Sequence, residues 1–228
     1  MILFASFANY LEVAAKNFQE GGPFMYGIAI LLFFALAIGV ERTYALFMKL
    51  YVDGVGFMAS VQKLVASGKV PQALKVCNYH KRAALARVIQ AGLSVANQGE
   101  EALQDAIDEA TLDVLPEIQK RTIYLQMIAN VATLLGLLGT IVGLIGAFAG
   151  LSEVDPAARQ DALGQGISIA LNTTAFGLIV AIPAMIFHSF LMARTLKIID
   201  EIDRFSVKLV NLLVRVFGRT PRSPSSRV

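Results

Sequence analysis

The sequence predicts an all-α membrane protein with three transmembrane helices, and two observations support this prediction. Hydrophobic residues make up 56% of the 228 residues and charged residues only 16%, which is more apolar than an ordinary soluble domain. In addition, three runs contain no charged side chain: residues 21–40, 122–152 and 162–193. A helix needs about 20 apolar residues, at ~1.5 Å rise each, to cross a bilayer core of ~30 Å. Each run is long enough to do so.

Composition and motifs argue against several other classes of protein. The net charge of +3 is too small to indicate a nucleic-acid partner. Cys77 is the single cysteine, and together with His80 it offers only two of the three or four ligands that a zinc site needs. We therefore expect Cys77 to be a buried thiol. The sequence contains no phosphate-binding motif, nucleophile–base pair or metal-ligand spacing, so we predict no enzyme activity, cofactor or metal.

Residues 1–20 predict an amphipathic helix lying on the membrane surface. Apolar residues recur there at helical spacing with polar residues between them, and no basic segment precedes them as in a cleavable signal. The apolar positions include Phe4, Phe7, Leu11, Ala14 and Phe18. Residues 21–41 form the predicted first transmembrane helix.

The distribution of basic residues predicts how the chain is oriented in the membrane. Basic residues follow the first and third runs and precede the second, whereas the connection at residues 153–161 holds three acids and only Arg159. The flanking basic residues are Arg42, Lys49, Lys120, Arg121, Arg194 and Lys197. By the positive-inside rule, residues 42–121 and the C-terminal part are cytoplasmic, the N-terminus lies outside, and residues 153–161 are periplasmic.

The cytoplasmic segment, residues 42–121, predicts a helical domain. Its pattern indicates helices over 56–67, 71–79 and 83–97, followed by a helix from Glu100. Little turn signal apart from Pro116 separates that last helix from the second transmembrane helix at 122–152. We therefore expect one continuous helix to leave the membrane here.

The third transmembrane helix is predicted at 162–193 and is followed by a cytoplasmic helix at 194–217. An apolar stripe through Ile202, Phe205 and Leu209 predicts packing on the cytoplasmic helices or on a neighbouring subunit. Residues 218–228 are polar and proline-rich, which predicts a disordered tail.

Glycines in the second run share one helical face, which predicts close approach of another helix. Their spacing alternates between three and four residues, as in small-residue membrane interfaces. They are Gly136, Gly139, Gly143, Gly146 and Gly150, and Gly177 in the third run joins the predicted packing residues.

Hydroxyl groups at similar depth in two spans are the second polar feature. Thr140 lies near the middle of the second run, and Thr173 and Thr174 lie about 18 Å along the third. Polar groups at this depth usually face a bundle interior or a watered cavity, although a threonine can also bond its own backbone. Asn172 and Thr174 point nearly opposite ways, so we expect Thr174 to line a pore and Asn172 to serve helix packing. Thr140 and Thr173 are the other predicted pore-lining residues.

Asp, Glu, Lys and Arg are absent from all three runs. His188 lies close to the cytoplasmic rim, where we expect an interface residue rather than a proton relay. Membrane proteins that carry protons normally hold a titratable group inside the membrane. Either the chain conducts nothing, or a partner helix supplies a carboxylate.

The strings "LLGLLGTIVGLIGAF" and "GISIALNTTAFGLIVAIPA", with the acidic helix before the second run, resemble the MotA/TolQ/ExbB proton-channel family. Three spans with an outside N-terminus are similar to its ExbB/TolQ branch. The sequence departs from that branch at Ile169, where a glutamate is common, and at "VGL" (142–144), where "WGI" is usual.

The resemblance implies a multi-pass subunit of the bacterial inner membrane that forms a ring, typically a homopentamer, in the lipid bilayer. It implies a single-span partner of the ExbD/TolR/MotB type whose transmembrane Asp faces Thr140 and Thr174, while the glycine stripe packs subunits together. The expected function is a motor or stator that uses the proton-motive force to power transport, envelope maintenance or motility such as gliding. We expect Pro183 to bend the third helix and shape the cytoplasmic mouth. The alternative is a non-conducting membrane scaffold that recruits cytoplasmic proteins.

Overall fold

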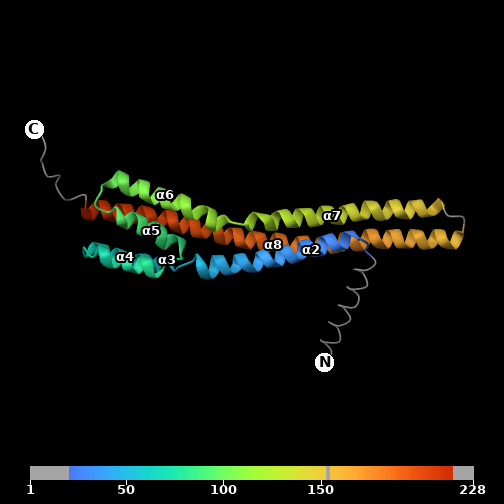
Figure 1. Cartoon of the computed structure of the whole chain (residues 1–228), viewed down its shortest axis with the longest axis horizontal. Coiled ribbons are helices and arrows are strands. Elements are labelled where there is room, and N and C mark those ends of the chain that lie inside the picture. Colours follow the sequence, from blue (N-terminus) through green and yellow to red (C-terminus); the bar gives the residue numbers. More distant parts are fainter. Residues whose placement is uncertain (1–20, 153–154, 218–228) are drawn as a thin grey trace, which may run out of the picture. The chain divides into compact units, whose positions relative to one another are not determined.

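The computed structural model describes residues 21–152 and 155–217, and within these ranges all regular structure is helical. The elements are α2 (Phe24–Tyr44), η1 (Ala45–Lys49), α3 (Gly54–Ala66), α4 (Val70–Tyr79), α5 (Ala84–Ser94), α6 (Glu100–Gln119), α7 (Thr122–Ala149), η2 (Gly150–Ser152) and α8 (Pro156–Phe217). Figure 1 shows them along the chain. The predictions for residues 1–20 and 218–228 lie outside the described residues.

Within the described ranges, three helical segments are long and apolar enough to cross a membrane, which agrees with the three predicted spans. They lie within Phe24–Ala66, Glu100–Ser152 and Pro156–Phe217, and at most 28% of the most apolar window in each is buried. Apolar surface exposed over such lengths requires lipid or other protein around it.

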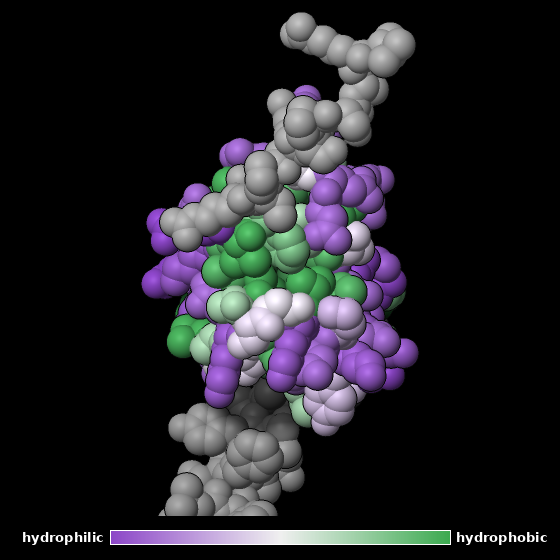
Figure 2. Space-filling view, turned by 90° about the vertical axis from the view of Figure 1, so that its left-hand side faces the viewer, coloured by the Kyte–Doolittle hydropathy of each residue, from purple (hydrophilic) through white to green (hydrophobic). Residues whose placement is uncertain are grey.

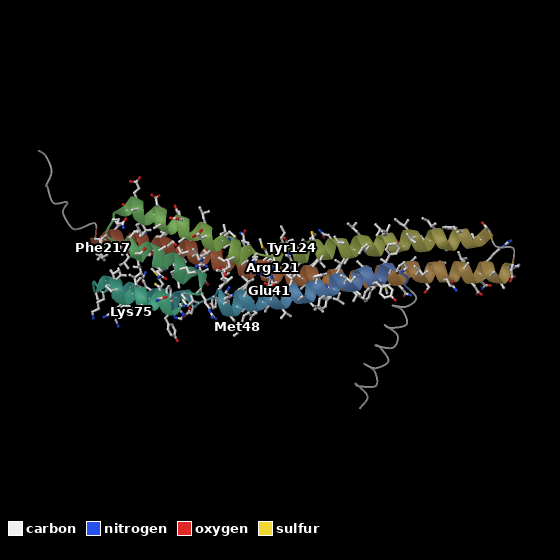
Figure 3. The ribbon with its side chains drawn as sticks, viewed as in Figure 1. Glu41, Met48, Lys75, Arg121, Tyr124 and Phe217 are labelled. Atoms are coloured by element: carbon white, nitrogen blue, oxygen red, sulfur yellow. The ribbon has the colours of Figure 1, made fainter. Side chains whose placement is uncertain are left out.

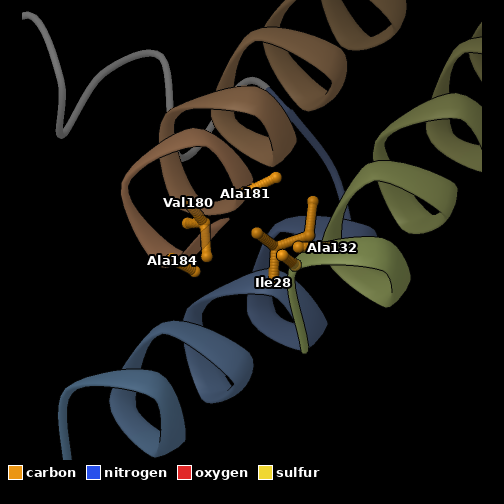
Figure 4. Packing of buried hydrophobic residues seen from close by; sticks show 6 residues of the cluster. Ile28, Ala132, Val180, Ala181 and Ala184 are labelled. Atoms are coloured by element: carbon orange, nitrogen blue, oxygen red, sulfur yellow. The ribbon is translucent and has the colours of Figure 1, made fainter. Parts of the chain in front are cut away.

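The chain divides into two compact units, and the first contains residues 1–40 and 121–189. Its described part consists of α2 up to Val40, α7, η2 and α8 up to Ser189. Its core lies where three helices meet: Ile28 of α2, Ala129 and Ala132 of α7, and Val180, Ala181 and Ala184 of α8. Figure 4 shows these side chains meeting between the three helices, where the alanines of α7 and α8 permit a close approach.

The second unit contains residues 41–120 and 190–228. Figure 2 looks onto one end of this unit, where hydrophilic side chains surround a smaller apolar area. The apolar stripe of α8 packs inside this unit, since a Cβ added at Gly92 of α5 would lie 3.0 Å from both Leu209 and Ile107. The first of the two predicted partners for this stripe, the chain's own helices within residues 42–121, is therefore the one observed.

The prediction of one continuous helix over residues 100–152 is wrong. Helix α6 passes through Pro116 and ends at Gln119, while α7 starts at Thr122. Between them Arg121 adopts a left-handed conformation with φ of 60°, at the junction marked in Figure 3. Arg42 explains the end of α6, because its buried guanidinium donates hydrogen bonds to the Glu117 and Ile118 carbonyls.

Helix α8 also differs from its predicted limits. It begins at Pro156, which makes the connection expected at 153–161 shorter. It then continues without interruption to Phe217, so the third span and the C-terminal helix are one element. Pro183 lies exposed within this helix and does not end it. The predicted helices at 56–67, 71–79 and 83–97 correspond to α3, α4 and α5, with ends shifted by up to three residues.

Candidate functional site

The glycine stripe of α7 brings its backbone against the backbone of α8. A Cβ added at Gly143 would lie 2.7 Å from the Gly166 carbonyl oxygen and 2.8 Å from the Ala170 nitrogen. At the next contact, a Cβ at Gly177 would lie 2.8 Å from the Ala132 carbonyl oxygen. No side chain larger than hydrogen fits these points without moving a backbone, so glycine there permits the close helix packing.

This packing changes the expected role of the stripe. Gly136, Gly139 and Gly143 contact α8 of the same chain, and Gly150 faces Ala162 of α8. These positions therefore pack two helices of the same chain, as the predicted close approach of another helix requires, whereas the family resemblance implied packing between subunits. Gly146 differs, since a Cβ there would meet nothing within 4 Å among the described residues.

Thr174 connects α8 to α7 through its hydroxyl. Its Oγ1 donates a hydrogen bond of 3.0 Å to the Gly136 carbonyl oxygen, and the side chain is half-buried. This bond ties the threonine to the backbone of α7 at the level of the glycine contact.

Thr140 lies on α7 one turn beyond Gly136, about 6 Å along the helix. Its hydroxyl donates to the Leu137 carbonyl oxygen on its own helix at 2.5 Å, and the side chain is half-buried. The two threonines predicted to line a pore therefore lie within about one helical turn of each other at the α7–α8 contact. In the structure, both hydroxyls donate hydrogen bonds to backbone carbonyls.

Thr173 does not fit the predicted pore-lining role. It is fully buried, and its Oγ1 lies 2.6 Å from the Ile169 carbonyl oxygen and 2.8 Å from the Gly21 carbonyl oxygen. Because successive helical residues differ by about 100°, Thr173 points away from the direction of Thr174. Thr173 holds the segment before α2 against α8.

Asn172 forms its hydrogen bond within α8. Its Nδ2 donates to the Ser168 hydroxyl oxygen at 3.2 Å, and both side chains are half-buried. His188 is half-buried further along the same helix.

Three further polar residues of α7 continue the line of Thr140, and our sequence analysis missed them. Gln126 and Thr133 precede Thr140 by fourteen and seven residues, which places all three on one face of the helix. Asn130 accepts a hydrogen bond of 3.1 Å from the Gln126 side chain, and Asn130 and Thr133 are exposed. The seven-residue spacing of Gln126, Thr133 and Thr140 could have identified this polar face from the sequence.

In the second unit, Glu117 of α6 accepts two charged hydrogen bonds. Lys49 donates at 3.0 Å and Arg87 at 2.7 Å. The hydrogen bond from Lys49, followed by that from Arg87, holds the pKa of Glu117 below its ordinary value. This cluster joins η1, α5 and α6 beside the carbonyls that Arg42 binds.

The described residues contain no cluster of His, Cys, Asp and Glu able to hold a metal ion. Cys77 is buried as predicted, and burial raises the pKa of its thiol to about 11. The polar groups within the three predicted runs are hydroxyls, amides, backbone carbonyls and the imidazole of His188.

Comparison with known proteins identifies the family of this chain. The sequence profile of the MotA/TolQ/ExbB proton channel family matches residues 80–204, more than half of the chain, including α7 and the membrane part of α8. The chain belongs to the MotA/TolQ/ExbB proton channel family. A protein of Methanothermobacter thermautotrophicus, named as a biopolymer transport protein ExbB homolog, is 26% identical over 200 residues. The similarity covers 87% of this chain and 69% of that protein.

Membership of the MotA/TolQ/ExbB family, with three spanning segments, makes the chain a multi-pass membrane protein with a proton-channel role in energy transduction. The range that matches the family, residues 80–204, includes the two threonines and the polar residues of α7.

Proposed function

We propose that this chain is the ring subunit of a motor in the bacterial inner membrane that is driven by the proton-motive force. The observation that carries the proposal is the pair Thr140 and Thr174, which lie within about one turn of each other in a proton-channel family member. The ring is a homopentamer with the N-terminus outside and the second unit in the cytoplasm, and it powers transport, envelope maintenance or motility.

A partner protein supplies the titratable group. The spans contain hydroxyls but no carboxylate, and a hydroxyl cannot by itself take up and release protons near neutral pH. A single-span partner of the ExbD/TolR/MotB type, with one transmembrane Asp facing the α7–α8 contact, completes the path.

The hydrogen bond of Thr174 suggests how the ring senses the protonation state of that Asp. An ionised carboxylate is a stronger acceptor than a backbone carbonyl, because hydrogen bonds to charged acceptors are roughly twice as strong. When the Asp is ionised, the Thr174 hydroxyl turns from the Gly136 carbonyl to the carboxylate. When the Asp is protonated, the bond to Gly136 reforms and the partner is released to move.

The polar residues Thr133, Asn130 and Gln126 form the cytoplasmic part of the path. They extend from Thr140 toward the start of α7 over fourteen residues, about 21 Å. The exposed amide of Asn130 on an otherwise apolar helix is unfavourable against lipid, so this side of α7 faces water or a partner. Each proton that crosses 100 mV releases about 2.3 kcal/mol, and repeated transfers drive the partner against the ring.

Proton flux in proteoliposomes that contain the complex purified from native membranes tests this proposal. We expect Thr174→Val, which keeps the shape but removes the hydroxyl, to lower flux about tenfold or more, and Thr174→Ser to retain it. Thr140→Val should also lower flux. The matched control is Ser189→Ala, because the Ser189 hydroxyl donates to Met185 on its own helix and is exposed.

Flux that is unchanged in both valine variants would reject the role of these threonines. A complex that conducts no protons in any form would favour the alternative, a membrane scaffold that recruits cytoplasmic proteins.

A further inference from the structure

The second unit contains an acidic groove between α6 and the last part of α8. The groove has a volume of about 430 Å³, and Glu100 and Asp108 of α6 and Asp203 of α8 line it. Ile107 and Val207 provide apolar surface between these carboxylates. A groove with this lining suits a cationic side chain that has an apolar stem, such as lysine or arginine.

Ser206 is a second, independent observation that points to a ligand in the groove. It lines the groove, its side chain is only 7% exposed, and its Oγ has no hydrogen-bond partner among the described residues. Buried hydroxyls in proteins are nearly always hydrogen-bonded, because leaving one unpaired is unfavourable. An occupant with a polar group would satisfy it.

The same chain carries a basic stripe that matches this groove. Arg204, Lys208 and Arg215 of α8 follow one another at spacings of four and seven residues, so they share one face of the helix. All three are exposed, and the cationic groups of Arg204 and Lys208 lie 5.9 and 5.2 Å from the Phe205 ring. Within the described part of the chain, no ion pair joins the stripe to a carboxylate.

The groove and the stripe lie on adjacent faces of α8 and share an edge at Asn211, which lines the groove and lies seven residues after Arg204. Asp203 and Val210 of the groove are about 100° or more around the helix from Arg204. A chain can therefore offer its stripe to one copy while its groove receives the stripe of another. Such head-to-tail contacts close into rings when the rotation between copies permits it.

We propose that the acidic groove of one subunit receives the basic stripe of a second copy of this chain. The proposal rests on the ring assembly of the proposed function and names the surface that joins neighbouring subunits in the second unit. Lys208 and Arg204 enter between the carboxylates, and one of their N–H groups donates to the Ser206 hydroxyl.

Charge reversal in the full-length protein tests the contact. The groove variant carries Asp108→Lys and Asp203→Lys, and the stripe variant carries Arg204→Glu and Lys208→Glu. We expect each to weaken subunit association about tenfold or more, measured by light scattering and native mass spectrometry in mild detergent. A chain with all four changes should associate to within about threefold of the unaltered protein, because the charges are again complementary.

The control variant carries Glu101→Lys and Glu109→Lys, two exposed acids of α6 that do not line the groove. It changes the net charge as much as the groove variant does and should leave association unchanged. Unchanged association in the groove and stripe variants would overturn the proposal. So would loss of association that the four-change chain does not restore.

Zero-length carbodiimide cross-linking of the unaltered protein gives a second measurement that does not depend on variants. With isotopically light and heavy copies mixed before assembly, we expect links from Lys208 of one copy to Asp203 or Asp108 of the other. Links from the groove only to lysines of other proteins would overturn the proposal and show a different partner.

The experiments can reject the groove contact without rejecting the motor function, and the reverse. If the ring forms independently of these charges while flux still depends on Thr174, the groove contact is wrong and the motor function stands. If the charges hold the ring together but Thr174 is irrelevant to flux, the reverse is true.

Discussion

Substitution of Gly143 by alanine should loosen the contact between α7 and α8. The added Cβ would lie 2.7 Å from the Gly166 carbonyl oxygen, whereas ordinary van der Waals contact begins at 3.4 Å. The difference, 3.4 − 2.7, is 0.7 Å, and the atoms in the way belong to the α8 backbone. Because a backbone cannot rotate aside as a side chain can, the two helices must separate locally.

The magnitude follows from the cost of overpacking, which is about 1–3 kcal/mol for a well-packed interior. For chains of this size, each kcal/mol lowers the melting temperature by roughly 2–4 °C, so we expect Gly143→Ala to melt about 2–12 °C lower. Thermal melting followed by far-ultraviolet circular dichroism in lipid nanodiscs measures this shift.

Gly146→Ala is the matched control, because its Cβ would meet nothing within 4 Å in the described structure. Alanine is favoured over glycine inside a helix by about 0.5–1 kcal/mol, so this variant should melt at the same temperature or slightly higher. If both variants melt at the same temperature, the assigned α7–α8 contact is wrong.

Three further predictions concern other residues. Lys49 and Arg87 lower the pKa of Glu117, so its contribution to stability is present above the ordinary value of 4.5 and is lost as the pH falls below it. Acid titrations should therefore show that Glu117→Gln removes part of the stability difference between pH 7 and acid; identical profiles would contradict the assignment. The Cys77 thiol, with its pKa raised to about 11 from 9.0, should react with maleimide about 100-fold more slowly at pH 8 in the folded protein than after denaturation. Comparable rates would show that it is not buried. Thr173→Val should lower the melting temperature, because the Gly21 and Ile169 carbonyls lose their shared donor, while Thr173→Ser should preserve it; equal melting of the two would exclude a structural hydrogen bond.

The helical class and the three spans could be predicted because they depend on properties of long segments. Runs without charge as long as residues 122–152 leave few alternatives to a membrane helix. The break at Arg121 could not be predicted in this way. It depends on Arg42, which is far away in the sequence and binds the last carbonyls of α6.

The candidate site could be predicted only in part, because its hydrogen bonds depend on local contacts between helices. The hydroxyl positions follow from the sequence, but the partner of each hydroxyl depends on how two helices meet. Thr173 and Thr174 are adjacent and chemically identical, yet one is buried against Gly21 and the other reaches Gly136 of α7. The glycine stripe likewise indicated a close helix contact without indicating whether the second helix belonged to the same chain.

The central claim is that this family member takes its titratable group from a partner, and purification of the protein from its native membranes tests it most directly. We predict that mass spectrometry of the purified complex finds a single-span protein with one Asp in its membrane segment, at a fixed ratio to this chain. Recovery of this chain only as a homo-oligomer with soluble cytoplasmic proteins, and without proton flux in liposomes, would contradict the account and leave Thr140 and Thr174 as packing residues.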